Sequence, residues 1–164
     1  TGNVGKPSWK SKMANQILNP KNSAHYMYKL RTKCRELDYV DFTQIKNGKH
    51  INQDYPAYLS KYCASIAAGT FYPVIKYFEI PAAGCLTFME VTENNDCKFL
   101  GFEDGKNAIF INEENYKERF LEFLEDRKNT KWVEIADAGR THALENLNND
   151  VALEKIIALM QKFQ

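Results

Sequence analysis

The apolar positions of the chain alternate between two periodicities. Side chains that recur at helical spacing predict helices at 24–36, 54–62, 73–83 and 96–100, and Asn112 is expected to cap a further helix whose first turn carries Glu113 and Glu114. Short, continuous apolar runs between them predict buried strands at 39–42, 63–68, 85–90 and 107–111. Strands of this kind, separated by helices, are typical of a parallel sheet that is covered on both faces.

The remaining third of the chain predicts a helical tail. Its apolar residues form successive amphipathic stripes, which include Leu121 and Leu124, then Trp132, Ile135 and Ala136, then Leu153, Ile156, Ile157 and Met160. We therefore expect one α/β domain over residues 1–164, with a doubly wound, Rossmann-like parallel sheet flanked by helices and a helical C-terminal tail.

Composition supports a folded chain. Hydrophobic residues make up 44% and aromatic residues 13% of the 164 residues. No apolar run approaches the roughly 18 residues of a membrane span, and the start does not resemble a signal peptide, so a cytoplasmic location is expected. The four Cys and three His residues are dispersed, which predicts neither a disulfide nor a metal site.

The net charge of +1 conceals a strong asymmetry. Residues 1–35 contain eight Lys or Arg residues and no acidic residue, whereas the rest of the chain holds all 21 acidic residues. A basic segment beside an acidic body predicts an anionic ligand, either a nucleic-acid backbone or a smaller phosphate group. A solvated basic segment without a ligand is the alternative.

Parallel sheets bind ligands at the carboxyl ends of their strands, and three loops, 2–12, 68–72 and 90–96, are expected to lie there. In the second loop, Gly69, Thr70, Phe71 and Tyr72 precede a predicted helix that carries Lys76 and Glu79. Free backbone amides at a helix start favour a phosphate, and a carboxylate about 10 Å further along can accept hydrogen bonds from two ribose hydroxyls. Alternatively, Glu79 pairs with Lys76 or another cation, and Tyr72 belongs to the core.

Four segments of the sequence resemble the group 1 glycosyltransferases. The segment 76–84, Lys-Tyr-Phe-Glu-Ile-Pro-Ala-Ala-Gly, is similar to the signature helix of that family in its Lys/Arg-x-Phe-Glu subgroup. Residues 101–111 resemble the family's glycine-containing turn and next strand, 115–126 its following helix, and 135–139, Ile-Ala-Asp-Ala-Gly, its closing helical region. The resemblance extends from about residue 62 to residue 148.

This resemblance implies the C-terminal, nucleotide-sugar-binding half of a GT-B glycosyltransferase. By analogy with the family, Glu79 would hold the donor ribose, and the loop 69–72 would lie against the diphosphate. Basic residues that neutralise the diphosphate would come from the acid-free segment, where Lys6, Lys10, Lys12 and Arg31 are candidates. A UDP- or GDP-sugar is the expected donor, and no metal is required if Lys or Arg stabilises the leaving group.

The resemblance also implies what the chain lacks. The start is expected to be cut from a longer protein, with the N-terminal, acceptor-binding domain missing, so the fragment alone is expected to bind donor without transferring sugar. Many family members carry a second glutamate that contacts the donor sugar at the position of Phe71, so sugar recognition does not carry over. The acceptor, carbohydrate or lipid-linked, and the catalytic residues stay unidentified.

Two other functions remain open at the level of the sequence. A nucleic-acid-binding module would use the basic segment, with Trp9, Tyr26 and Tyr28 as stacking surfaces. A non-catalytic α/β interaction domain would need no ligand site, and in that case Glu79 would tolerate replacement.

Overall fold

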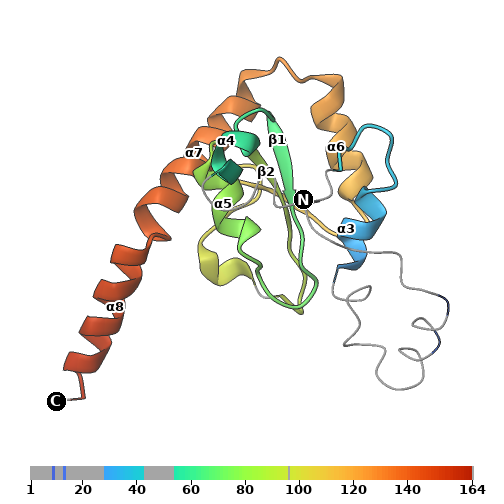
Figure 1. Cartoon of the computed structure of the whole chain (residues 1–164). Helices are drawn as coiled ribbons and strands as arrows, with labels where there is room; N and C mark the ends of the chain where they lie inside the picture. The colour runs from blue at the N-terminus through green and yellow to red at the C-terminus, as the bar shows by residue number, and fades with distance from the viewer. Residues whose placement is uncertain (1–8, 10–12, 14–27, 43–53, 96, 164) are drawn as a thin grey trace.

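The computed structural model describes residues 9, 13, 28–42, 54–95 and 97–163. Its centre is a three-stranded parallel sheet made of β1 (Ala64–Ala67), β2 (Leu86–Glu90) and β3 (Ile109–Ile111), in the order β1-β2-β3 (Figure 1). Ala64 pairs with Leu86, and Phe88 pairs with Ile109. All three carboxyl ends therefore lie at the same edge of the sheet, as the alternating pattern predicted.

Helical elements connect and cover the strands. They are α3 (Lys29–Cys34), α4 (Asp54–Leu59), α5 (Lys76–Ala82), the 3-10 helix η2 (Cys97–Leu100), α6 (Tyr116–Glu125), α7 (Thr130–Asn146) and α8 (Asn149–Gln161). Between consecutive strands the chain passes through α5 or η2 and then enters the sheet in the same direction. Such crossovers are what parallel strands require.

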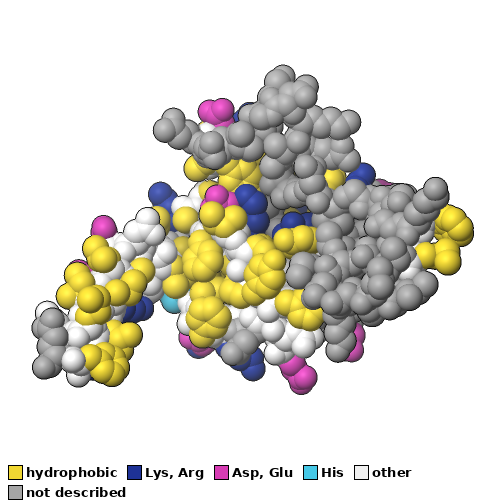
Figure 2. Space-filling model, turned by 60° about the horizontal axis from the view of Figure 1, so that its bottom comes forward, with side chains coloured by type: hydrophobic (Ala, Val, Ile, Leu, Met, Phe, Trp, Pro, Cys, Tyr) yellow, Lys and Arg dark blue, Asp and Glu magenta, His cyan; other side chains and the backbone are white. Residues whose placement is uncertain are grey.

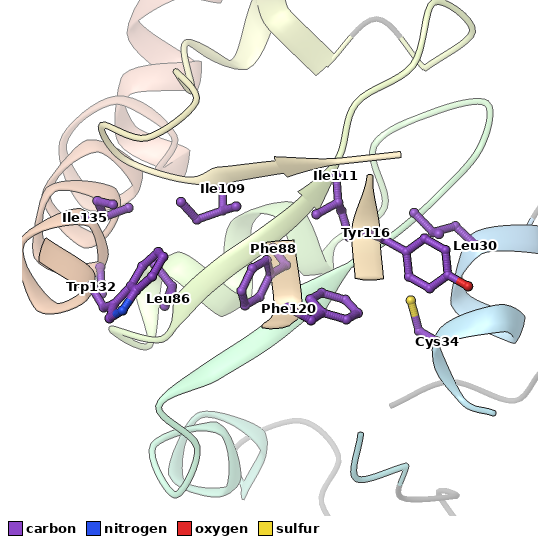
Figure 3. Close-up of a cluster of buried hydrophobic side chains, with 11 residues drawn as sticks. Leu30, Cys34, Leu86, Phe88, Ile109, Ile111, Tyr116, Phe120, Trp132 and Ile135 are labelled. Atoms are coloured by element: carbon purple, nitrogen blue, oxygen red, sulfur yellow. The ribbon is translucent and has the colours of Figure 1, made fainter. Parts of the chain in front are cut away.

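One face of the sheet packs against α3, α6 and α7. Phe88 of β2 lies at the middle of this core, with its ring centroid 4.8 Å from that of Phe120 in an edge-to-face arrangement. Figure 3 shows Leu30 and Cys34 of α3 at one side of the cluster and Trp132 and Ile135 of α7 at the other.

The other face packs against α4, α5 and η2. Tyr77 and Ile80 of α5 are almost fully buried there, together with Met89 of β2 and Tyr55 of α4. Every residue of β2 is buried, including the polar Thr87 and the charged Glu90, so the strand has no exposed face. The chain is thus a mixed α/β domain with helices on both faces of a parallel sheet.

The predicted strand at 39–42 is wrong. These residues form a turn and a bend, and the Val40 amide donates to the Leu37 carbonyl. The apolar side chains pack singly against the side of the core, where the Tyr39 ring lies edge-to-face on Phe120 at 6.5 Å. An apolar run of four residues does not distinguish a strand from such a packed turn.

The helix predicted at 73–83 is shorter than expected. It begins at Lys76, so Pro73 precedes the first turn instead of occupying it, and Pro81 lies inside the helix. Its predicted stop is confirmed, because Gly84 has a φ of +80°, a left-handed conformation that glycine adopts without strain.

The tail is helical, as predicted, and α8 projects from the rest of the chain (Figure 1). None of its residues is buried, and apolar side chains are visible along it in Figure 2. Of the helices that the structure describes, none combines the length and the apolar character that crossing a membrane would require.

Candidate functional site at the carboxyl end of the sheet

Polar and charged residues gather where the three strands end. Glu90 is the last residue of β2, the loop 68–70 follows β1, and Glu113 follows β3. Helix α3 adds three cations, Lys29, Arg31 and Lys33, to the same edge. This is the edge at which parallel α/β sheets bind ligands.

A buried amide ties the first two loops together. The Asn95 side chain donates from Nδ2 to the Gly69 carbonyl at 3.0 Å and to the Glu90 carbonyl at 2.8 Å. Its Oδ1 accepts from the Thr92 amide at 3.0 Å, and the Thr92 hydroxyl donates to the Thr70 carbonyl at 3.2 Å. The loop after β1 is therefore held in place by the loop after β2.

Arg31 lies against the loop after β1. Its Nη2 donates to the Ala68 carbonyl at 2.6 Å, and its Cζ atom lies 4.4 Å from the centroid of the Tyr28 ring. Burial lowers the pKa of Arg31, and the neighbouring Glu90 partly opposes this shift. An arginine that is held partly out of water can bind phosphate through its remaining guanidinium N–H groups.

Glu90 is the most unusual group of the site. The residue is only 1% exposed, and burial raises the pKa of its carboxyl to about 7. The negative charge of Glu113 raises this pKa further, whereas the backbone of Gly69 and the charge of Arg31 lower it. Within the described part of the chain, the buried Glu90 Oε2 and the buried Thr70 Oγ1 have no hydrogen-bond partner.

Glu113 joins two lysines of α3. Its carboxylate oxygens lie 2.8 Å from Lys29 Nζ and 2.6 Å from Lys33 Nζ. Burial by itself would raise the pKa of Glu113, but the hydrogen bonds from the two lysines together lower it. These lysines are thus partly neutralised, and among the residues that the structure describes Arg31 is a cation that contacts the loop after β1.

Glu79 pairs with Lys76, which is the alternative that the sequence left open. The Lys76 Nζ atom lies 2.6 Å from Glu79 Oε2 and 3.3 Å from the centroid of the Tyr55 ring. The Glu79 side chain is 35% exposed, so its carboxylate is at the surface and not buried without a partner. The pair is accessible to a ligand that could exchange with Lys76 for hydrogen bonds to Glu79.

The structure brings several of the predicted site residues together. Arg31 is directly at the loop that contains Gly69 and Thr70, and Arg31 and Lys76 border the same cavity of about 220 Å³. Gly69 is tightly placed, because a Cβ atom there would lie 2.7 Å from the Tyr72 carbonyl oxygen. Tyr72 is 48% exposed and not part of the core, and Phe71 is half-buried. Lys6, Lys10 and Lys12 lie outside the described residues.

Sequence reasoning named the loop 90–96 but did not single out Glu90, Asn95 or Glu113. The available signal was a charged residue at the carboxyl end of an otherwise apolar strand, which Glu90 provides. The partners of Asn95 could not be found in this way, because its hydrogen bonds join two loops 26 residues apart in sequence.

The described residues contain no group of three or more His, Cys, Asp or Glu side chains that could hold a metal ion. Comparisons of the chain with protein-family models, with curated proteins and with solved structures found no match.

Proposed function

We propose that this chain is the donor-binding half of a glycosyltransferase, which moves a sugar from a nucleoside-diphosphate sugar to an acceptor still to be identified. The proposal rests on the sequence resemblance over residues 62–148 and on one structural observation. Arg31, from the acid-free segment, lies 2.6 Å from the carbonyl of Ala68, at the start of the loop that the resemblance assigns to the diphosphate. The basic segment of the sequence and the carboxyl end of β1 therefore meet at this loop.

In this proposal, the diphosphate lies beside the loop 69–72 and Arg31. Lys76 borders the same cavity as Arg31 and is proposed as a second cation for the ligand, although the lining of that cavity does not include residues 69–72 or Glu79. Cations placed at the leaving group stabilise the nucleoside diphosphate as the glycosidic bond of the donor breaks, which lowers the barrier to transfer. Arg31 and Lys76 can supply this stabilisation.

Glu79 is proposed to bind the donor ribose. Its carboxylate is on α5, at the surface, where it can accept hydrogen bonds from two vicinal hydroxyls. The ligand would replace the ion pair with Lys76, in which the Lys76 and Glu79 side chains are 17% and 35% exposed. Lys76 would then be free to turn toward the diphosphate.

The proposal includes the finer points of the architecture. We propose that the three-stranded sheet belongs to a doubly wound, Rossmann-like domain, and that a separate N-terminal domain binds the acceptor. The helices on both faces of the sheet support the first point.

Calorimetric titration of the full chain with UDP, with GDP and with a short single-stranded DNA tests the proposal. We expect saturable binding of one nucleoside diphosphate and a loss of at least about tenfold in affinity, or about 1.4 kcal/mol, for Glu79→Ala. Glu118→Ala is the matched control, because it removes an exposed helical carboxylate from α6.

Each alternative function gives a different result. Salt-sensitive binding of DNA alone, with no effect of Glu79→Ala, would support a nucleic-acid-binding module. Binding of neither nucleotide nor DNA would overturn the proposal for this chain and favour a non-catalytic interaction domain.

A further inference from the structure

Strand β1 is an edge strand, and part of its backbone points away from the sheet. The strand order is β1-β2-β3, so β1 has one neighbour. The Leu86 amide donates to the Cys63 carbonyl at 2.9 Å, and in a parallel ladder the backbone groups of alternate residues point to the same side. Cys63 and every second residue after it therefore face β2, whereas the N–H and C=O groups of Ala64 and Ile66 face outward.

The next residue of the outward series supports this direction. The Ala68 carbonyl accepts the hydrogen bond from Arg31 Nη2 at 2.6 Å, on the side away from β2. Among the residues that the structure describes, the outward groups of Ala64 and Ile66 have no hydrogen-bond partner. Both residues are half-buried, and buried backbone groups in folded proteins are nearly always paired.

The outward side of β1 borders a cavity of about 220 Å³. Residues 64–66 line it, together with Phe120 and Phe123 of α6 from one face of the sheet and Tyr55 and Leu59 of α4 from the other. Figure 1 shows α6 and α4 on either side of β1. A single water needs roughly 10–15 Å³, so the cavity has room for a much larger group.

The walls of the cavity favour a single extended segment as its occupant. An extended chain can offer hydrogen-bond partners to the outward groups of β1 at the roughly 4.8 Å spacing of paired strands. A second copy of this chain would bring its own α4 and α6 beside its own β1, and these helices would meet the walls before the two edges could pair. A lone strand brings no such helices.

Opposite charges lie at the two ends of this edge. Arg31, at Ala68, uses one of the five N–H groups of its guanidinium in the hydrogen bond described above. Asp41 also borders the cavity, and its Oδ2 accepts from the Tyr62 hydroxyl at 2.5 Å. Because Tyr62 precedes β1 and Ala68 follows it, a strand that runs parallel to β1 would begin near Asp41 and end near Arg31.

We propose that the edge of β1 binds an extended segment of a partner protein as a fourth, parallel strand. The segment would carry a basic residue at its N-terminal end, β-branched residues in its middle and an acidic residue at its C-terminal end. Main-chain hydrogen bonds to Ala64 and Ile66 supply the affinity, and Asp41 and Arg31 set the direction. This inference goes beyond the proposed function and does not depend on it.

The probe is the peptide acetyl-Lys-Thr-Val-Thr-Val-Thr-Glu-amide, which is as long as the segment from Tyr62 to Ala68. Titration of the full chain, followed by NMR, should show saturable binding with a dissociation constant below about 1 mM. At ten times that concentration of peptide, hydrogen exchange of the Ala64 and Ile66 amides should slow about tenfold. The peptide acetyl-Glu-Thr-Val-Thr-Val-Thr-Lys-amide should bind at least about fivefold more weakly, because both charges are then mismatched.

Peptides methylated on backbone nitrogen test for a strand ladder. One version is methylated at its Thr amides and the other at its Val amides, and alternate amides of a strand point to opposite sides. Methylation on the side that faces β1 should weaken binding at least about tenfold, since it removes two or three hydrogen bonds. The other version should bind within about threefold of the parent peptide.

Ala64→Pro tests the same edge in the chain. It removes an outward N–H and leaves the ladder with β2 intact, and proline is tolerated at the first residue of an edge strand. Binding of the probe should weaken at least about tenfold. Ala64→Gly is the matched control, because it keeps the N–H, and it should bind like the wild type. The methylated peptides decide the question if Ala64→Pro does not fold.

Several results would overturn the inference. They are no binding of the probe, equal binding of the two methylated peptides, and equal binding of the peptide with exchanged charges. Protection of the Ala64 and Ile66 amides that rises with the concentration of the chain alone would show pairing between two copies, and would overturn it as well. Binding of the probe without binding of UDP or GDP would retain this inference and overturn the donor site, and the converse result would do the reverse.

Discussion

Two glutamates of the chain, Glu79 and Glu90, differ in what surrounds them. Glu79 is at the surface and pairs with Lys76, while Glu90 is buried and carries a strongly raised pKa. The sequence drew attention to Glu79 because it interrupts an apolar run, and it offered Lys76 as the partner. Glu90 escaped notice because its environment comes from loops that are distant in sequence.

The raised pKa of Glu90 makes stability depend on pH. The folded protein holds this proton up to a pH of about 7, whereas an unfolded chain releases it near the ordinary carboxyl pKa, so stability falls as pH rises between these values. Glu90→Gln should therefore gain stability over the wild-type protein at pH 8, by at most about 3 kcal/mol, and little at pH 4.5. Urea unfolding at both pH values measures this, and an equal difference at the two would contradict it.

The Asn95 side chain is predicted to carry much of the loop's stability. Asn95→Ala leaves the carbonyls of Gly69 and Glu90 without this donor and should destabilise the protein by about 2–4 kcal/mol. Its neighbour provides the control, because Asn94 is exposed and Asn94→Ala should change stability by less than about 0.5 kcal/mol. Equal effects of the two substitutions in thermal unfolding would show that the network is not stabilising.

At the level of elements, the strands that are buried on both sides were the most predictable. Strands β2 and β3 lie within the predicted runs. A strand that is covered on both faces needs side chains that can be buried at successive positions, which limits where along the chain it can lie. The stretch 39–42 failed because its apolar residues contact the rim of one core only. The predicted start of α5 at Pro73 was too early, because a proline is compatible with the first turn of a helix but does not require a helix to begin there.

Helix α7 depends on a glycine for its approach to the sheet. A Cβ atom at Gly139 would lie 2.4 Å from the Asn107 carbonyl oxygen, in the loop before β3. Gly139→Ala should cost at least about 2 kcal/mol, even after the roughly 1 kcal/mol that alanine gains in a helix.

A second glycine gives the comparison for this effect. Gly105 has a φ of +70° and open space around it, so Gly105→Ala should cost only the left-handed strain of about 1–2 kcal/mol. Urea unfolding of the two variants separates close packing from backbone conformation. A Gly139→Ala protein as stable as the wild type would show that α7 can shift away from β3.

For the molecule as a whole, the charge asymmetry of the sequence has a visible counterpart. The described part of the basic segment lies over the acidic edge of the sheet, where Lys29 and Lys33 pair with Glu113 and Arg31 contacts the loop after β1. Some of the basic charge is thus used inside the fold. Which basic side chains pair within the fold could not be predicted from the sequence, because the pairs join residues about 80 positions apart.

Helix α8 contributes little to this body. Because α8 has no buried residue, deletion of residues 149–164 should change the free energy of unfolding by less than about 1 kcal/mol. Urea unfolding of the shortened chain measures this, with the full chain as the reference. A larger loss of stability would show that the exposed apolar side chains of α8 are packed in solution.

NMR mapping of nucleotide binding is the most direct test of the proposed donor site. Addition of UDP or GDP to the full chain should shift the backbone amides of Gly69, Thr70, Arg31 and Glu79 together, with one common dissociation constant. Shifts confined to residues away from these strand ends, or no shifts with either nucleotide at millimolar concentration, would contradict a donor site at the carboxyl edge of this sheet.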